Sequence, residues 1–486
     1  SGGMDHSLAV KRDGTVWAWG RNTNGQLGDG NMGTDSDTPV QVEGAGGTGK
    51  LTDVVGVSGG GYHSLAIKAD GTAWAWGLNG DGQLGDGTQT DSYIPVAVSG
   101  GHVFVDLEVG EHSTCGLTAS GDAWCWGGNS SGELGAGLPT TGEDNFSRIP
   151  VPVAGGLDFT DLSIGLGTVC GVATDGVSYC WGLGRDGQLG NNQLGENSPV
   201  PVAVTNSGTL GFVTVDPGYF ATCALDGTGA VYCWGRDYGN FGNGSTGSNQ
   251  TPIPVSAASG MRFSSLDVGT TSLCGIDGDA NVHCWGWINS AGQQGNGTLT
   301  AQDSPTPVSG TLDFTQVFSD NNNTVLASSC GIATTNATWC WGANQFGQLG
   351  GVSNEQCNTA GGVHDCSTTP IAVTGGVPYA SLALGAEHTC GLAPDGSVNC
   401  WGENDHGQLG DGSLNDSPVP VIVADPGGQP GVGPIVVTPY VSQLTLFEST
   451  LQLDAVAHDL NDNPLPTQPA FEWTSQNPSV ATVDAT

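Results

Sequence analysis

The sequence contains very few basic residues. Nine Lys and Arg stand against 47 Asp and Glu, which gives a formal net charge of −38, and no Lys or Arg follows Arg262. A chain with this charge is repelled by phosphate backbones and by anionic membrane surfaces. We therefore expect it to bind no nucleic acid.

Long apolar runs and helical periodicity are also missing. No stretch approaches the ~20 apolar residues that a helix needs to cross a bilayer, so direct membrane insertion is not expected. No signal peptide is present, so export would require an upstream segment that has been removed. Apolar residues nowhere recur with the helical period, which favours an all-β fold.

A phrase ending in Trp-Gly is present eight times, at intervals of 50 to 60 residues. Its tryptophans are Trp19, Trp76, Trp126, Trp181, Trp234, Trp285, Trp341 and Trp401. Repeats of this length are typical of arrays and propellers. We expect these tryptophans to form the cores of the repeated units.

Each copy contains about four short runs that suit β-strands, two of them around an Asp-Gly or similar turn. In the second copy the predicted strands are 54–57, 63–67, 73–76 and 95–98. Four short strands cannot bury both faces alone, but radially arranged sheets pack on one another as propeller blades. Eight repeats favour eight blades. The first repeat lacks an opening strand, which we expect residues 433–441, or residues upstream of Ser1, to supply.

The fourteen cysteines form seven close pairs in the sequence. Six pairs are ten residues apart and centred on the turn, namely Cys115–Cys125, Cys170–Cys180, Cys223–Cys233, Cys274–Cys284, Cys330–Cys340 and Cys390–Cys400, and the seventh is Cys357–Cys366. Two strands folded about that turn would place each pair at a distance that suits a disulfide. In the first two repeats, Ser7 with Ala18 and Ser64 with Ala75 are expected at the equivalent places.

Zinc is the competing explanation for paired cysteines, but it needs a second pair nearby, and the ten-residue spacing recurs without one. Seven disulfides imply an oxidising compartment. We therefore predict an extracellular or cell-surface protein.

The eighth copy runs His388-Thr-Cys-Gly-Leu-Ala-Pro-Asp-Gly-Ser-Val-Asn-Cys400-Trp-Gly-Glu-Asn-Asp-His-Gly-Gln-Leu-Gly-Asp-Gly412. This pattern resembles the regulator of chromosome condensation repeat, and the resemblance covers about residues 1–424. Members of that family are usually seven-bladed, so seven blades is the alternative. Among them, the secreted bacterial β-lactamase inhibitor protein II is similar in scaffold, which implies a binding role.

The chain changes character after residue 424. Residues 1–424 are the predicted propeller, and 425–435 form a Pro/Gly-rich linker. Residues 436–486, with Trp-Thr-Ser-Gln-Asn-Pro-Ser-Val-Ala at 473–481, resemble the start of a group 2 bacterial Ig-like domain. That resemblance implies an incomplete β-sandwich.

No catalytic, cofactor or metal site stands out, and we predict a protein without enzyme activity. His6, His63, His112 and His388 share one place in four repeats, which suggests a structural hydrogen bond. Calcium is the one cofactor left open, because Asp29, Asp86, Asp411, Asp459 and Asp462 lie in Asp-rich loops; their more common role is in forming turns.

The functional hypothesis rests on places where the repeats differ, because a binding site should break the pattern. Phe146, Tyr238, Phe241 and Trp287 stand where other copies are polar or aliphatic, and aromatic residues are typical interface anchors. Two insertions, at 138–146 and 351–366, also break the pattern of the repeats. The first hypothesis is a propeller that recognises a protein or glycan at a cell surface. The alternative is self-assembly into an extracellular fibre or surface layer, and an enzyme with carboxylates in the central channel comes third.

Overall fold

The structure is a computed structural model of the whole chain. It describes residues 1–238, 241, 247–255, 260–269, 271–319, 327–359 and 362–424, together with the backbone of 435–438 and 454–457. The chain divides into two compact units, Ser1–Val423 and Ala424–Thr486. Nearly all described residues of regular structure are in strands, as the sequence predicts. Among the described residues, no helix is both long and apolar enough to span a membrane.

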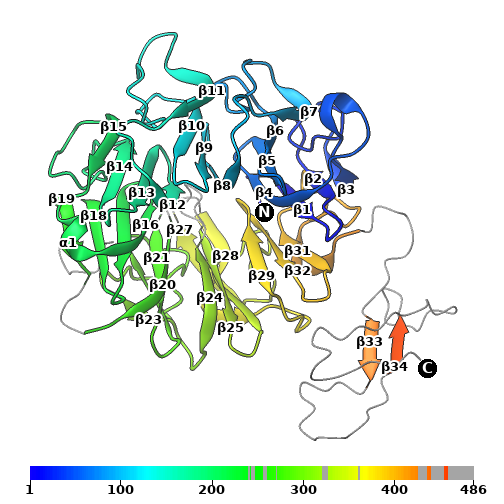
Figure 1. Cartoon of the computed structure of the whole chain (residues 1–486). Helices are drawn as coiled ribbons and strands as arrows, with labels where there is room; N and C mark the ends of the chain where they lie inside the picture. The colour runs from blue at the N-terminus through cyan, green and yellow to red at the C-terminus, as the bar shows by residue number, and fades with distance from the viewer. Residues whose placement is uncertain are drawn as a thin grey trace, which may run out of the picture. The chain divides into compact units, whose positions relative to one another are not determined.

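The first unit is a ring of eight antiparallel sheets, the eight blades of a β-propeller (Figure 1). Blade 1 contains β1 (His6–Val10), β2 (Val16–Gly20) and β3 (Ser36–Gln41). Blade 2 contains β4 (Val54–Gly59), β5 (His63–Lys68), β6 (Ala73–Gly77) and β7 (Ser92–Ala97). Blade 3 contains β8 (Phe104–Val109), β9 (Ser113–Thr118), β10 (Ala123–Gly128) and β11 (Phe146–Pro152). Blade 4 contains β12 (Phe159–Ile164), β13 (Thr168–Ala173), β14 (Ser178–Gly182) and β15 (Ser198–Ala203).

Blade 5 contains β16 (Phe212–Pro217), β17 (Ala221–Asp226), β18 (Val231–Asp237) and β19 (Gly247–Pro254). Blade 6 contains β20 (Phe263–Val268), β21 (Ser272–Asp277), β22 (Val282–Gly286) and β23 (Thr306–Pro307). Blade 7 contains β24 (Phe314–Ser319), β25 (Ser328–Ala333), β26 (Thr338–Ala343) and β28 (Gly362–Ala372), with β27 (Glu355–Thr359) added as a fifth strand. Blade 8 contains β29 (Ser381–Leu384), β30 (His388–Leu392), β31 (Val398–Gly402) and β32 (Ser417–Ile422). Short helices η1 (Ala45–Gly47) and α1 (Ser207–Leu210) lie in the connections.

The strands of a blade follow one another in sequence from the centre of the ring outward, except in blade 7, where β28 comes before β27. First strands of adjacent blades lie against one another, for example β8 with β12 and β16 with β20. Because the strands alternate in direction, the loops after the first and third strands of every blade emerge on one face of the ring. We call this face the mouth face. The turns after the second and fourth strands emerge on the opposite face.

Each blade is joined to the next by its repeated tryptophan. None of the eight is more than 2% exposed. The indole Nε1 of Trp76 donates to the main-chain oxygen of Gln26 in the preceding blade at 2.8 Å. Equivalent bonds of 2.8 to 3.0 Å are made by Trp19, Trp126, Trp181, Trp234, Trp341 and Trp401.

Among the described residues, a glycine makes room for seven of these indoles. Gly85 has a left-handed φ of +67°, and a Cβ built on it would lie 2.8 Å from Nε1 of Trp126. Gly190 meets Trp234 in the same way, at 2.7 Å. The last Gly of the Gly-Gln-Leu-Gly phrase is therefore required for two reasons, its left-handed backbone conformation and the closeness of the neighbouring indole.

All seven predicted disulfides are present, and the structure contains no free cysteine among its described residues. Six of them join the second and third strands of blades 3 to 8, as Cys115 and Cys125 do across β9 and β10. In blades 1 and 2 the equivalent pairs are Leu8 with Ala18 and Leu65 with Ala75. The prediction that placed Ser7 and Ser64 there was one residue out of register.

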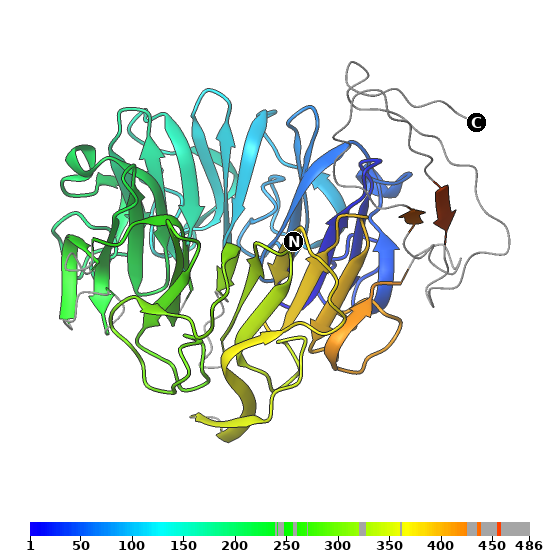
Figure 2. The same cartoon turned by 90° about the horizontal axis from the view of Figure 1, so that it is seen from below.

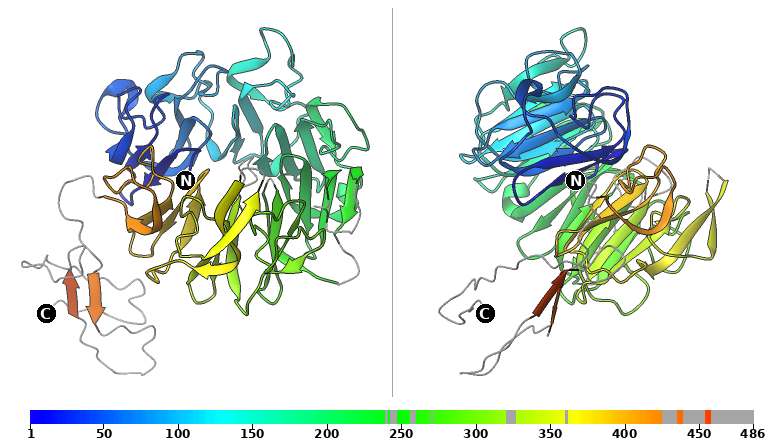
Figure 3. Two further views of the ribbon diagram at one scale, coloured as in Figure 1. Left: turned by 180° about the vertical axis from the view of Figure 1, so that it is seen from behind. Right: turned by 90° about the vertical axis from the view of Figure 1, so that its right-hand side faces the viewer.

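The ring closes by contacts between blades 8 and 1, which adjoin in Figure 3 (orange and dark blue). Nε1 of Trp19 donates to the Gln408 oxygen at 2.9 Å, and the Ser7 hydroxyl lies 3.0 Å from Nε2 of His388. Inside blade 1, Gly2 pairs with Ser7 at the position of the absent opening strand. The prediction that residues 433–441 fill that position was wrong, because β33 (Ile435–Thr438) pairs with β34 (Asp454–Ala457) in the second unit.

The second unit is described only at β33 and β34, which form a two-stranded antiparallel sheet. The predicted linker at 425–435 and the remainder of the predicted Ig-like segment at 436–486 lie outside the described residues. Their assignment stays a prediction.

Reducing the protein should weaken blades 3 to 8 but not blades 1 and 2. Each short disulfide loop contributes about 3 kcal/mol in the chain-entropy description. Hydrogen exchange before and after treatment with dithiothreitol should show lost protection in β9–β10, β13–β14 and their equivalents, with β1–β2 and β5–β6 as the internal control. Equal loss in all eight blades, or free thiols in the native protein, would contradict the assignment.

The Gly85→Ala substitution should destabilise the ring more than Gly176→Ala. Both glycines have positive φ, +67° and +80°, but a Cβ at Gly176 meets nothing within 4 Å. The matched pair isolates the collision with Trp126, which we expect to cost about 1 to 3 kcal/mol, as overpacking a core does. Thermal melting of the two variants measures it. Equal melting temperatures would show that the indole slot tolerates a methyl group.

Candidate functional site

Two of the four predicted interface residues come together on the mouth face. Tyr238 follows β18 of blade 5 and Trp287 follows β22 of blade 6, and their ring centroids are 5.0 Å apart. Phe220, in the loop between β16 and β17, lies 5.5 Å from Tyr238 and 6.0 Å from Trp287. Tyr219 stands next to it, at 4.3 Å. We call Phe220, Tyr238 and Trp287 the aromatic cluster.

The aromatic cluster is accessible and is braced by an ion pair. Tyr238 is 39% exposed, and Phe220 and Trp287 are partly buried. The guanidinium carbon of Arg236 lies 4.5 Å from the Tyr238 ring centroid, and its Nη1 is 3.3 Å from the Asp186 carboxylate of blade 4. A cation over an aromatic face restricts the ring without covering its edge. The cluster therefore presents a partly fixed apolar surface to solvent.

Phe241 does not belong to this surface, and its prediction as an interface residue was wrong. It is fully buried and packs in the core with Cys223, Phe263 and Trp285. The reason is its register, because Phe241 follows Gly239-Asn240 and so takes the Leu place of the Gly-Gln-Leu-Gly phrase. In the other blades that place is also buried, as at Leu84 and Leu189.

Phe146 is separate from the aromatic cluster in the chain and in the ring. It begins β11 of blade 3, is partly buried, and has the guanidinium of Arg148 5.1 Å from its ring centroid. Its role as an interface residue stays a prediction.

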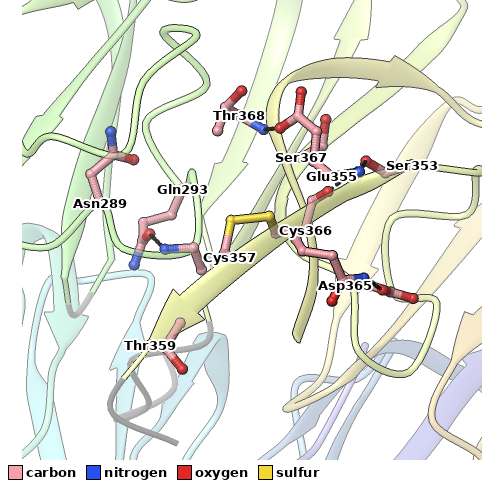
Figure 4. The surroundings of a disulfide bond; sticks show 12 residues. Asn289, Gln293, Ser353, Glu355, Cys357, Thr359, Asp365, Cys366, Ser367 and Thr368 are labelled. Carbon is pink, nitrogen blue, oxygen red and sulfur yellow. Dashed lines mark hydrogen bonds between the residues drawn. A yellow bond between two sulfur atoms is a disulfide. The ribbon is translucent and has the colours of Figure 1, made fainter. Parts of the chain in front are cut away.

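The insertion of blade 7 forms a hairpin, β27 and the first half of β28, which extends past the neighbouring strands in Figures 2 and 3 (yellow). Cys357 and Cys366 join its two strands and are buried. Figure 4 shows the disulfide beside Asn289 and Gln293 of blade 6, which lie in the same loop as Trp287. Departures from the repeat in blades 5, 6 and 7 thus gather on the mouth face.

An open cavity of about 700 Å³ lies at the centre of the mouth face. Its wall comes from the ends of first strands and the loops that follow them, including Gly60, Gly110 and Gly385, and from the loops after the third strands of blades 2 and 3. Three carboxylates, Asp81, Glu111 and Glu133, line it, and so does Tyr219. Because Tyr219 contacts Phe220, the cavity wall is continuous with the aromatic cluster.

His112 also lines the cavity, and its predicted equivalence to the other histidines was wrong. Ser113, not His112, takes the place of His63 opposite the Trp-Gly glycine. The one-residue shift leaves the His112 side chain 52% exposed, 3.3 Å from Asp81 and 3.6 Å from Glu111.

The other three histidines make the predicted structural hydrogen bonds. Nε2 of His6 bonds the Ser64 hydroxyl at 2.9 Å, His63 bonds Thr114 at 3.3 Å, and His388 bonds Ser7 at 3.0 Å. Each bond joins one blade to the next. Burial lowers the pKa of His6 and His63 to about 3 and that of His388 to about 4, so the rings are neutral near pH 7.

Acidic side chains on the first strands form an arc on one side of the ring's centre, in blades 3 to 6. They are Asp106, Glu108, Asp161, Asp216 and Asp267. Two of them bridge blades, since Asp216 accepts from the Val268 N–H at 3.1 Å and Asp267 from the Ser319 N–H at 3.0 Å. Asp216 also accepts from the Ser163 hydroxyl at 3.3 Å.

Burial raises the pKa values in this arc, and mutual repulsion adds to the effect. The pKa is about 8 for Glu108, about 7 for Asp267 and about 6 for Asp216, and that of Asp161 is also raised. Sequence reasoning missed these residues. A signal was available, because the fifth residue of the first strand is acidic in blades 3, 5 and 6 only.

The arc is the asymmetric set of channel carboxylates on which an enzyme hypothesis would depend. Its best-connected members, Asp216 and Asp267, are engaged by main-chain N–H groups of the next blade, which is a structural use. Among the described residues, no three His, Cys, Asp or Glu side chains are arranged to hold a metal ion.

The Asp-rich loops proposed for calcium serve as turns. Asp29, Asp86 and Asp411 each accept hydrogen bonds from the main-chain N–H two residues later and from the Asn seven residues earlier. Their carboxylates are thereby occupied with local bonds, as the turn interpretation predicts. Asp459 and Asp462 lie outside the described residues.

The Asp267→Asn substitution should stabilise the ring at neutral and alkaline pH but not at pH 4. A carboxyl group whose pKa is raised from about 4 to about 7 contributes its full stability below pH 4 and loses it as the pH rises through 7. Asn still accepts from Ser319 but never ionises. Melting temperatures should therefore match at pH 4 and differ by a few degrees at pH 8. Asp13→Asn, at an exposed turn, is the control; a gain at pH 8 in both variants would contradict the argument.

Comparison with known proteins accounts for the repeats. The model of the "Regulator of chromosome condensation (RCC1) repeat" matches residues 13–67, 70–117, 175–225 and 395–437, and a second model of that repeat matches 54–83, 104–133 and 379–408. The Ultraviolet-B receptor UVR8 of Arabidopsis thaliana is 29% identical over 376 residues, which are 76% of this chain and 81% of that protein.

Two further comparisons agree with this result, one in sequence and one in fold. The human E3 ubiquitin-protein ligase HERC2 is 33% identical over 63% of this chain, but the match spans only 6% of that protein. The crystal structure of Prp20p from Saccharomyces cerevisiae superposes with a TM-score of 0.55 at 16% identity, covering 87% of this chain and 89% of that one. This similarity concerns the fold alone. The chain thus contains regulator of chromosome condensation repeats, and its structure is an eight-bladed propeller.

Proposed function

We propose that the chain is a recognition module without catalytic activity that binds a partner with its mouth face. The observation that carries the proposal is the aromatic cluster of Phe220, Tyr238 and Trp287, which breaks the repeat and is accessible beside an open cavity. Accessible aromatic side chains in a fixed arrangement are typical anchors of interfaces. A rigid ring that carries variable loops suits this use.

The related propellers support a binding role. UVR8 is a receptor, and Prp20p binds Gsp1p and histones. Their partners are not transferred to this chain, because the loops that decide contacts differ between propellers. What supports the proposal is the use of the same scaffold for binding.

We further propose that the propeller works outside the cytosol, at a cell surface or in the extracellular medium. Seven disulfides that use all fourteen cysteines suit an oxidising compartment. The large negative charge, with few Lys and Arg, is compatible with a solvent-exposed extracellular surface. The partner in this setting is a protein or a glycan.

The experiment compares three versions of the full chain for binding to intact cells of the source organism, measured by flow cytometry with a fluorescent label. The double variant Tyr238→Ala/Trp287→Ala should bind at least about thirtyfold more weakly, the loss typical of removing interface anchors. Val213→Ala/Leu392→Ala is the matched control, because these side chains are 50% and 43% exposed and lie at the ends of β16 and β30 that face away from the mouth.

Equal binding by all three versions would contradict the mouth-face proposal. Electron microscopy and light scattering of the unmodified protein supply the second readout. Ordered filaments or sheets would support self-assembly instead, and dispersed single rings would support recognition of another molecule.

A further inference from the structure

The cavity at the mouth presents negative charge without compensation. Asp81, Glu111 and Glu133 line it, and among the described residues that line it none is Lys or Arg. Asp81 and Glu111 have 47% and 44% of their side chains exposed, so they are available to a ligand. The nearest counter-charge is the His112 ring between them, which is positive only when protonated.

Of the four arginines at the mouth face, two are paired with carboxylates, Arg21 with Asp5 at 2.9 Å and Arg236 with Asp186 at 3.3 Å. Arg148 bonds the Gln89 amide oxygen, and Arg185 is exposed in the loop after β14. Four of the remaining cations, Lys11, Lys50, Lys68 and Arg262, lie at the opposite ends of the strands, next to turns of the other face. With these cations on the other face, the mouth is more negative than an even distribution of charge around the ring would make it. It therefore attracts cations more strongly.

Deeper in the ring, the acidic arc holds further carboxyl groups, which add negative charge only where they are ionised, because the pKa of Glu108 is raised to about 8 and that of Asp267 to about 7. Glu108 interacts with Asp106, Asp161 and Asp216, and Asp267 interacts with Asp216, so the charged neighbours that act on these groups are carboxylates. A cation entering from the mouth would relieve the repulsion among them.

An apolar surface adjoins this acidic one. Tyr219 lines the cavity and contacts Phe220 at 4.3 Å, and Phe220 continues to Tyr238 and Trp287. A ligand that carries both positive charge and an apolar side chain would satisfy both parts. A neutral sugar would stack on the aromatic rings and donate hydroxyl hydrogen bonds to the carboxylates, but it would bring no positive charge to offset theirs.

We infer that the mouth face binds a basic polypeptide segment, whose Lys or Arg side chains enter the acidic cavity while an apolar side chain packs on the aromatic cluster. This inference rests on the proposed function and specifies the chemistry of its partner. Charge complementarity of this kind sets the association rate and makes binding sensitive to salt.

The test measures fluorescence anisotropy of three labelled peptides of equal length with the full chain. One peptide is Arg-rich with a central Trp, one is Arg-rich with Ala in place of the Trp, and one is Glu-rich with a central Trp. We expect binding in the order given, with no binding of the Glu-rich peptide. Affinity for the first should fall by about tenfold or more between 50 and 300 mM salt, because several ion pairs are screened.

Matched variants locate the site. Asp81→Asn/Glu111→Gln should weaken the Arg-rich peptides about tenfold, as the loss of two near ion pairs in water predicts. Asp13→Asn/Asp70→Asn removes the same charge from exposed turns of the opposite face and should change affinity little. Tyr238→Ala/Trp287→Ala should weaken only the peptide with Trp.

Equal weakening by the two charge variants, or no binding of either Arg-rich peptide, would overturn the inference. A glycan array run with the same versions separates this failure from failure of the proposed function. If Tyr238→Ala/Trp287→Ala abolishes binding to a neutral glycan, the mouth face is a recognition surface but its partner is not a basic peptide. If the variant changes neither glycan nor cell binding, both proposals fail.

Discussion

The ring depends on one hydrogen bond that recurs around it, from a buried indole N–H to a main-chain oxygen of the preceding blade. An indole carries a large apolar surface and a single donor, so it can fill an inter-blade core only if that donor finds an acceptor. The Gly-Gln-Leu-Gly loop supplies the acceptor at Gln26 and its equivalents, and its last Gly leaves space for the ring. Each blade thereby completes the core of its neighbour.

This arrangement explains why the fold could be predicted from the sequence. The Trp-Gly phrase, the turn and the Cys pairs are all local, and together they specify the second and third strands of every blade. When eight such hairpins close into a ring, every repeated Trp is buried between neighbouring sheets. The disulfides follow from the same register, because antiparallel pairing about the turn brings residues ten apart face to face.

The mistakes at Ser7, Ser64, His112 and Phe241 share one physical cause, which is register. In a strand, a shift of one residue moves a side chain to the other face. Without fixing the copies to the Trp-Gly glycine, His112 looked equivalent to His63, although Ser113 holds that place. Phe241 looked exceptional because its blade has Asn for Gln and Phe for Leu, although it fills the ordinary buried position. The contact between Tyr238 and Trp287 joins two blades, so the sequence could suggest each residue but not the contact between them. The acidic arc was missed for the same reason, because its members belong to different blades.

The six hairpin disulfides all lie within single blades, and every blade-to-blade contact is noncovalent. For each of these cysteines, the native partner is only ten residues away along the chain. Oxidative folding therefore involves a local pairing in each hairpin and no search among distant thiols. The same locality means that a blade can be duplicated or lost in evolution as a self-contained unit, because its covalent links never extend into the units beside it.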